Sequence, residues 1–290
     1  MNNTKSKVTA IHRDIFQQVA KGGRVALVYH LQISDGDAYN NWFRKSTDLL
    51  ESMAGNRPFN MSVDPAPREG MFINEIIIDE YPSAEVALKF VAATQADLTE
   101  SCNNVTVIAI QPNSPVKLRI VRIVAWLMHF LKGINDSGTP TANWKANNTA
   151  VWPDEQQMAV AREQDLDRPL LVYNLNKNRE MAQYKNPPLG SKPCSGEEAY
   201  ERYSKIAGTQ LLRRGGYPVY GGKPIGILIG DDNSMLADDW SKFILVYYPQ
   251  RRNLLAMIEG DEFKSGQHHR DAGLERVVIF MGNDKRAVST

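Results

Sequence analysis

The fold is decided by the stretch VALVYHL at residues 25–31, a run of apolar and aromatic residues that is typical of a buried β-strand. A similar run, LLVYNL at residues 170–175, follows in the second half of the chain. Aligning the two runs makes Tyr29 and Tyr173 equivalent. Because an internal repeat determines the whole architecture, the segments that follow each run carry the prediction further.

Each predicted strand is followed by a predicted helix with two aromatic residues three positions apart. These are Tyr39 and Trp42 in the first half, and Tyr200 and Tyr203 in the second half. Residues at that spacing lie on the same face of a helix. Both helices are therefore expected to pack an aromatic face against a sheet.

Further strands complete the pattern in both halves. Strands rich in Ile, Val and aromatic residues are predicted over 72–81 and 243–248, and each ends in a Tyr-Pro pair that opens a helical pattern, since proline is tolerated in the first turn of a helix. The last strands are predicted over 105–110 and 277–280. The order is strand, helix, strand, strand, helix, strand, and it occurs twice.

This order predicts an α+β fold made of two tandem ferredoxin-like βαββαβ repeats. A four-stranded sheet with helices on one face leaves the other face bare, so two such sheets are expected to form one intramolecular α+β barrel around a small apolar site. The predicted parts are a helical lead (1–23), a first unit (24–111), a helical connector (112–168), a second unit (169–283) and a tail (284–290).

Composition excludes several classes of protein. The 290 residues include 34 basic and 33 acidic side chains, so the net charge of +1 gives no field that would favour nucleic acid. Cys102 and Cys194 are far apart and lack the spacing of a zinc site or a disulfide framework. The start, residues 1–7, is polar and unlike a signal peptide. We expect a cytoplasmic protein.

The connector contains an amphipathic segment at residues 116–132. On a helix, Arg119, Arg122, His129 and Lys132 share one side and, apart from Lys117, the other residues are apolar. The charges of this segment argue against a membrane-spanning helix. Two interpretations remain open: a helix packed against the barrel or a partner subunit in a homo-oligomer, or a peripheral helix on the inner face of the membrane that touches anionic lipid. Arg119, Arg122, Trp126 and Lys132 would make these contacts.

The second half resembles a known group of proteins. Over about residues 168–282 it is similar to a bacterial family of unknown function in the dimeric α+β barrel superfamily, on the motifs LVYNLNK (171–177), Cys194-Ser195-Gly196, Ala199-Tyr200, Tyr203, Gly215-Gly216, Trp240, Tyr248-Pro249, His269-Arg270 and Ala272-Gly273-Leu274-Glu275. An acidic pair usual after Trp240 is replaced by Ser241-Lys242. The resemblance implies the ferredoxin-like fold and a superfamily that includes monooxygenases, polyketide cyclases, isomerases and haem-binding enzymes.

Catalytic candidates cluster in the segment Gln267-His268-His269-Arg270-Asp271. Histidine transfers protons near neutral pH, and a guanidinium holds a carboxylate or an enolate in a fork. His269 is therefore predicted as the acid/base and Arg270 as the anion holder. The alternative is a solvated loop in which Arg270 forms a structural ion pair.

Tyr173 is predicted as a further catalytic group, and Asn174, His30, Tyr200, Tyr203 and Trp240 as ligand-binding groups. Alternation along a strand places only one of Tyr173 and Asn174 inside the barrel. His30 takes the place of Asn174 in the first unit, so the two residues are expected to face one cavity. The alternative for each tyrosine and for His30 is a role in core packing.

No cofactor is predicted. Haem is the alternative, with His129, His268 or His269 as ligand, but the chain lacks the C-x-x-C-H attachment motif. No metal triad, no G-x-S-x-G motif and no phosphate-binding glycine loop is present.

Two functions follow from these observations. The first is a small-molecule enzyme that acts on a hydrophobic aromatic, polyketide-like or acyl substrate by cofactor-independent acid/base chemistry, as a cyclase, isomerase or monooxygenase would. The second is a non-catalytic ligand-binding or self-assembling protein that docks on a membrane or a partner through the 116–132 helix.

Overall fold

The computed structural model of the protein describes residues 16, 23–136, 145–146, 148–186, 192–231 and 234–288. The predicted helical lead, 1–23, lies outside the described residues except for Phe16 and Gly23. The chain forms two compact units. The first comprises Met1–Pro112, Gly222–Asp239 and Gly282–Thr290, and the second comprises Asn113–Gly221 and Trp240–Met281.

The first unit contains the predicted βαββαβ order. Its elements are β1 (Val25–Ile33), α2 (Gly36–Ser52), β2 (Asn56–Val63), β3 (Glu75–Tyr81), α3 (Ala84–Ser101) and β4 (Cys102–Pro112). The strands are antiparallel and hydrogen-bonded in the order β4-β1-β3-β2. Tyr39, Trp42 and Leu50 of α2 lie in a core with alternate residues of β1, which confirms the aromatic helix face.

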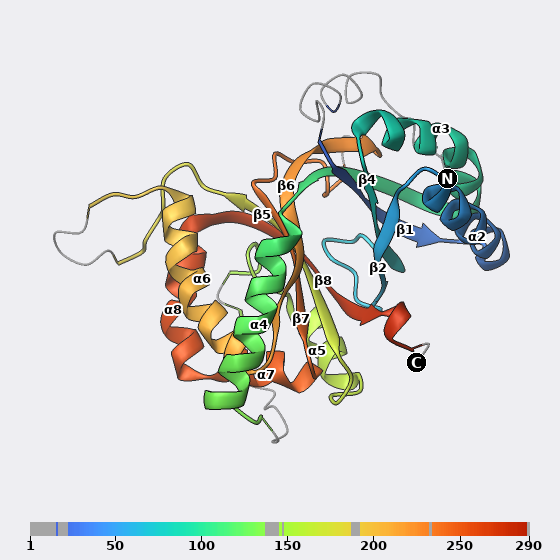
Figure 1. The fold of residues 1–290 in the computed structure, drawn as a ribbon. Coiled ribbons are helices and arrows are strands. Elements are labelled where there is room, and N and C mark those ends of the chain that lie inside the picture. The colour runs from blue at the N-terminus through green and yellow to red at the C-terminus, as the bar shows by residue number, and fades with distance from the viewer. Residues whose placement is uncertain are drawn as a thin grey trace. The chain divides into compact units, whose positions relative to one another are not determined.

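The second unit repeats this strand order as β8-β5-β7-β6. Here the second helix of the repeat is divided at Gly260 into two helices. The elements are α4 (Pro115–Lys132), α5 (Glu155–Glu163), β5 (Leu170–Asn178), α6 (Gly196–Arg213), β6 (Tyr217–Ile229), β7 (Lys242–Tyr248), α7 (Arg251–Glu259), α8 (Asp261–Gly273) and β8 (Leu274–Asp284), followed by a 3-10 turn, η1 (Lys285–Val288) (Figure 1).

The complete strand order, β1-β3-β2-β8-β5-β7-β6-β4, is that of a closed barrel. The predicted fold class, a tandem ferredoxin-like repeat with a helical connector, is therefore confirmed. Strands β6 and β8 are long, and residues of each belong to both units.

Polar side chains fix where the helices begin. The Asp35 carboxylate accepts hydrogen bonds from the backbone N–H groups of Asp37 and Ala38, and the Ser83 hydroxyl accepts one from Val86. Ser195 and Glu198 form a reciprocal capping box at the start of α6. These local signals set the helix boundaries independently of the core.

The sequence alignment of Tyr29 with Tyr173 is wrong by one position. Tyr29 is the fifth residue of β1 and lies on the face covered by α2, with its ring centroid 6.3 Å from that of Trp42. Tyr173 is the fourth residue of β5 and packs against Phe243 and Phe280. Because successive residues of a strand point to opposite faces, a shift of one residue exchanges the faces.

Two glycines let α6 and α8 meet at their ends. A Cβ atom on Gly273, the last residue of α8, would lie 2.6 Å from the backbone oxygen of Gly196 at the start of α6. A Cβ atom on Gly196 would lie 2.5 Å from the oxygen of Gly273. Neither position has room for a larger residue, so this contact sets the spacing of the two helices.

We expect Gly273→Ala to lower the free energy of unfolding by about 1–3 kcal/mol, because the new methyl group would meet backbone atoms that cannot move aside. The matched control is Gly208→Ala within α6, where a Cβ atom would have no neighbour within 4 Å. That change should raise stability by about 0.5–1 kcal/mol. Urea denaturation measures both, and equal midpoints for the two variants would contradict the prediction.

Candidate ligand-binding site

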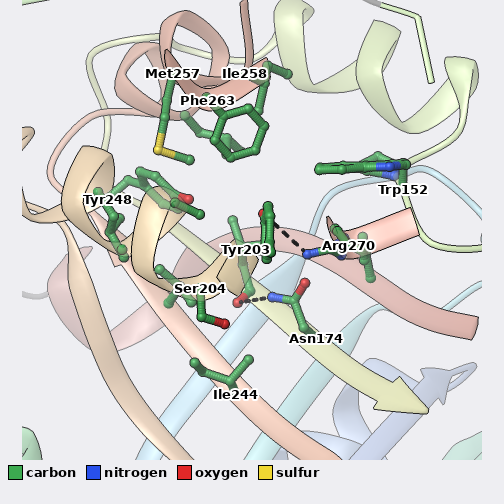
Figure 2. A pocket seen from close by; sticks show the side chains of 18 of the residues that line it. Trp152, Asn174, Tyr203, Ser204, Ile244, Tyr248, Met257, Ile258, Phe263 and Arg270 are labelled. Carbon is green, nitrogen blue, oxygen red and sulfur yellow. Dashed lines mark hydrogen bonds between the residues drawn. The ribbon is translucent and has the colours of Figure 1, made fainter. Parts of the chain in front are cut away.

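A cavity of about 290 Å³ lies in the second unit, between one face of its sheet and the helices that cover that face (Figure 2). The sequence had placed the site inside the barrel, on the other face. The lining is mainly apolar and comes from all the elements around it: Trp152, Pro153, Met158, Val172, Asn174, Tyr200, Tyr203, Ser204, Ala207, Gly208, Leu211, Pro218, Lys242, Ile244, Val246, Tyr248, Leu254, Met257, Ile258, Phe263, Arg270, Ile279 and Met281.

Arg270 is the buried charged group that lines this site. Its side chain is buried, with a residue exposure of 5%. The Nε atom donates to the backbone oxygen of Val151 at 2.9 Å, and Nη1 donates to the Tyr203 hydroxyl at 3.4 Å. The guanidinium also lies over the Trp152 ring, 4.5 Å from its centroid. Figure 2 shows Arg270 between Trp152 and Tyr203.

No carboxylate within the described part of the chain forms an ion pair with Arg270. The adjacent carboxylate, Asp271, instead accepts a hydrogen bond from the Trp152 indole N–H at 2.7 Å. A buried cation without a counter-ion is costly, because burial removes the hydration of the charge. An anionic ligand would supply the missing charge.

Tyrosine hydroxyls provide the polar groups next to Arg270. Burial raises the pKa of Tyr203 to about 12, although the neighbouring Arg270 charge acts in the opposite direction. Burial also raises the pKa of Tyr248. Both hydroxyls therefore keep their protons at neutral pH and can donate hydrogen bonds to a ligand oxygen.

The rim of the cavity adds a second cation. Lys242 is exposed, and its Nζ atom lies 5.7 Å from the centroid of the Tyr200 ring. Asn174 donates a 3.3 Å hydrogen bond from its amide nitrogen to the backbone oxygen of Val172. Among the described residues that line the cavity there are two cations, several hydroxyls and neither a carboxylate nor a histidine.

The first unit has acidic residues where this lining has none. Asp79 stands two positions before the Tyr-Pro pair of the first unit, and Val246 stands two positions before the equivalent pair of the second. The buried Asp79 carboxylate accepts two hydrogen bonds from the Arg57 guanidinium, at 2.7 and 2.9 Å. By the same alignment, Glu75 corresponds to Lys242. In the first unit the Asp79 carboxylate therefore neutralises Arg57, whereas in the second unit no carboxylate of the described residues forms an ion pair with Arg270.

The cavity brings together four of the residues predicted from sequence: Arg270, Asn174, Tyr200 and Tyr203. Tyr173 and Trp240 are buried but do not line it. Tyr173 lies on the opposite face of β5 from Val172 and Asn174, and Trp240 has the Arg276 guanidinium 5.6 Å from its ring centroid.

His269 and His30 are also elsewhere. His269 follows the exposed His268 on α8, and its Nδ1 atom is 2.7 Å from the Tyr184 hydroxyl, outside the cavity. Neighbouring residues of a helix point about 100° apart, so His269 cannot share the direction of Arg270. His30 is buried on the face of β1 opposite Tyr29, with Nδ1 3.2 Å from the backbone oxygen of Thr106. The prediction that His30 and Asn174 face one cavity is wrong, because only Asn174 is on a helix-covered face.

Sequence reasoning missed the contribution of the connector. Trp152, Pro153 and Met158 line the cavity, and Trp152 covers the Arg270 guanidinium. A detectable signal was present, since Asp154 and Gln157 form a capping box that starts α5 directly after Trp152-Pro153. The connector is therefore part of the site.

Known proteins similar to this chain were found by comparing its structure with solved structures. No protein-family model matches the chain, and no curated protein matches it by sequence. A protein of unknown function from Rhodopseudomonas palustris is 25% identical with a TM-score of 0.39, over 45% of this chain and 93% of the other. A mutant chlorite dismutase from Candidatus Nitrospira defluvii is 8% identical with a TM-score of 0.44, over 93% of this chain and 95% of the other.

A candidate monooxygenase from Lactobacillus acidophilus is 9% identical with a TM-score of 0.40, over 90% of this chain and 93% of the other. The ferredoxin-like fold that the sequence resemblance implies for this chain is confirmed by the chain's own strand order. The narrower resemblance of the second half to a bacterial family of unknown function stays a prediction.

The prediction that the chain uses no cofactor is contradicted by this comparison, in which several of the similar structures are chlorite dismutases. The residues that line the cavity do not fit haem, however. Haem iron takes His, Cys thiolate, Tyr or a Met with His as axial ligands. Among the described residues neither a histidine nor a cysteine lines the cavity, and the raised pKa of Tyr203 opposes an ionised tyrosine ligand. Within the described ranges no cluster of His, Cys, Asp and Glu could hold a metal ion.

The burial of His30 predicts that the stability of the fold depends measurably on pH. Burial lowers its pKa in the folded protein to about 4, from 6.5. Between these values the unfolded chain binds a proton that the folded protein does not, so stability falls as the pH drops from about 6.5 to 4. The loss should reach roughly 3 kcal/mol. Urea denaturation at several pH values should show a steeper fall for the wild type than for His30→Phe, and parallel curves would contradict the assignment.

Proposed function

We propose that the second unit binds a small, mostly apolar molecule through a carboxylate or another negatively charged oxygen, which the Arg270 guanidinium holds. The observation that carries this proposal is the buried arginine without a carboxylate partner in the described chain, in a cavity lined by apolar side chains. An apolar lining with a few convergent polar groups is the usual character of a small-molecule site.

The pattern of charge supports an anion rather than a neutral or cationic ligand. Arg270 and Lys242 line the cavity and the described lining contains no acid. In the equivalent region of the first unit the residues aligned with Val246 and Lys242 are Asp79 and Glu75. A ligand carboxylate in the second unit would take the role that Asp79 has for Arg57.

The position of Tyr203 makes this site suited to catalysis as well as binding. Its hydroxyl accepts a hydrogen bond from Arg270 and retains a proton to donate. A guanidinium and a phenol directed at one ligand oxygen would stabilise the negative charge of an enolate, the intermediate of many isomerisations and cyclisations. We therefore propose a small-molecule enzyme in which Arg270 and Tyr203, rather than His269, contact the reacting group.

A matched pair of probes tests the proposal. 1-Naphthoate and 1-naphthamide have the same aromatic body but differ in charge, and isothermal titration calorimetry measures their affinities. Wild type should bind the carboxylate more tightly than the amide. Arg270→Met should weaken naphthoate binding by about 10- to 100-fold, as expected for loss of a charged hydrogen bond, and change naphthamide binding by less than about threefold.

His269→Gln is the control, because His269 is the next residue but lies outside the cavity; it should bind naphthoate as the wild type does. Since Arg270 also donates to Val151, Tyr203→Phe provides a second variant that keeps the guanidinium and should weaken naphthoate binding by a smaller factor. Equal affinity of wild type for the two probes, failure of wild type to bind either, or unchanged binding in Arg270→Met would overturn the proposal.

A further inference from the structure

Helix α4 carries an apolar surface that no other part of the described chain covers. The exposed large apolar side chains of the described residues are Met181 and eight residues of α4: Val116, Ile120, Ile123, Val124, Trp126, Leu127, Phe130 and Leu131. Phe130 is 74% exposed, and Trp126 is 66% exposed. A contiguous patch of this kind is rare on a protein that works in water alone and marks an interaction surface.

The two sides of α4 are distinct. Ala125 is buried, and Leu118, Val121 and Met128 are half-buried, at the spacing of one helical stripe. This stripe faces the second unit, where α4 packs on α6 (Figure 1). We call the opposite stripe, with the eight exposed residues given above, the free face. It runs the whole length of the helix.

Charge indicates what covers the free face. Helix α4 contains Lys117, Arg119, Arg122, His129 and Lys132 and not one acidic residue, although the whole chain is nearly balanced. Two of these basic residues contact the second unit instead of the free face: the Arg122 guanidinium lies 5.8 Å from the centroid of the Tyr217 ring, and His129 Nδ1 lies 2.8 Å from the backbone oxygen of Arg213. Lys117 and Arg119 are exposed next to apolar residues of the free face, where long basic side chains can reach lipid headgroups while their stems lie along the acyl region. A second copy of the chain would bring two helices of like charge together, whereas anionic lipid complements them.

The remaining features of α4 favour lying on a bilayer over crossing it. No helix in the described part of the chain is long and apolar enough to span a membrane. The Trp126 and Phe130 rings stack on the free face with centroids 5.8 Å apart, and aromatic side chains are enriched at the boundary between headgroups and acyl chains. We propose that α4 docks the protein on the surface of an anionic bilayer through its free face.

Flotation with vesicles tests this docking. Wild type should rise with vesicles of phosphatidylcholine containing 30 mol% phosphatidylserine, and should do so much less with pure phosphatidylcholine or at high salt, which screens the basic residues. The paired change Ile123→Asp/Leu127→Asp should reduce the floated fraction by about tenfold or more, because two carboxylates would enter the apolar layer. Lys117→Glu/Arg119→Glu should reduce flotation only with the anionic vesicles.

Met181→Asp is the matched control, since Met181 is exposed to 51% and lies outside α4; it should float like the wild type. Circular dichroism and the urea midpoint establish that each variant is folded. Wild type that stays with the unbound fraction overturns the proposal. So does flotation of Ile123→Asp/Leu127→Asp, or a wild-type dimer that the same variant dissociates in the absence of vesicle binding, which would assign the free face to a second copy.

The docking surface and the ligand site are independent in these tests. Arg270→Met should float normally, and Ile123→Asp/Leu127→Asp should bind 1-naphthoate normally, because neither Ile123 nor Leu127 lines the cavity.

Discussion

The candidate ligand site depends on the contact between Gly196 and Gly273. A Cβ atom on either glycine would clash with the backbone oxygen of the other, so only glycine lets α6 and α8 approach this closely. That approach places Tyr203, two turns into α6, beside Arg270, one turn before the end of α8. Because Gly196 follows the Ser195 cap and Gly273 precedes β8 directly, the same contact also connects the helices to the sheet. The contact between the two helix ends thus also determines the distance between the Tyr203 hydroxyl and the Arg270 guanidinium.

The two repeats share one architecture but differ in what fills the helix-covered face of the sheet. Both have the same strand order and an aromatic helix face over the sheet. In the first unit, Asp79 and Arg57 fill the helix-covered face with a buried ion pair, and the Glu75 carboxylate is bound by Tyr39 and Lys285. In the second, Val246 and Lys242 stand at the aligned positions and a cavity remains. A repeated fold can keep its topology while one copy has a cavity and the other fills the equivalent space with side chains.

The sequence was sufficient for the fold because its signals are local and recur. Strand runs, helix caps and the two Tyr-Pro pairs determine the order of elements without knowledge of their packing. The site was only partly accessible. Arg270 was identified together with His269, although a helix separates neighbouring side chains by about 100° and only Arg270 enters the cavity. The faces on which Tyr29 and Tyr173 lie depend on strand register, and the position of Trp152 over Arg270 depends on how the connector folds. Strand register and the path of the connector are both determined by tertiary contacts, which local sequence patterns do not show.

The isolated charge of Arg270 has a consequence for how the sequence can change over time. An apolar side chain of similar length at this position would fill the same space without desolvating a charge, and replacements of that kind are often neutral or stabilising. Selection for stability alone would therefore remove Arg270. Under the proposed function, this arginine is a trade-off in which the fold gives up some stability for ligand binding, and laboratory selection for thermal resistance should discard it early.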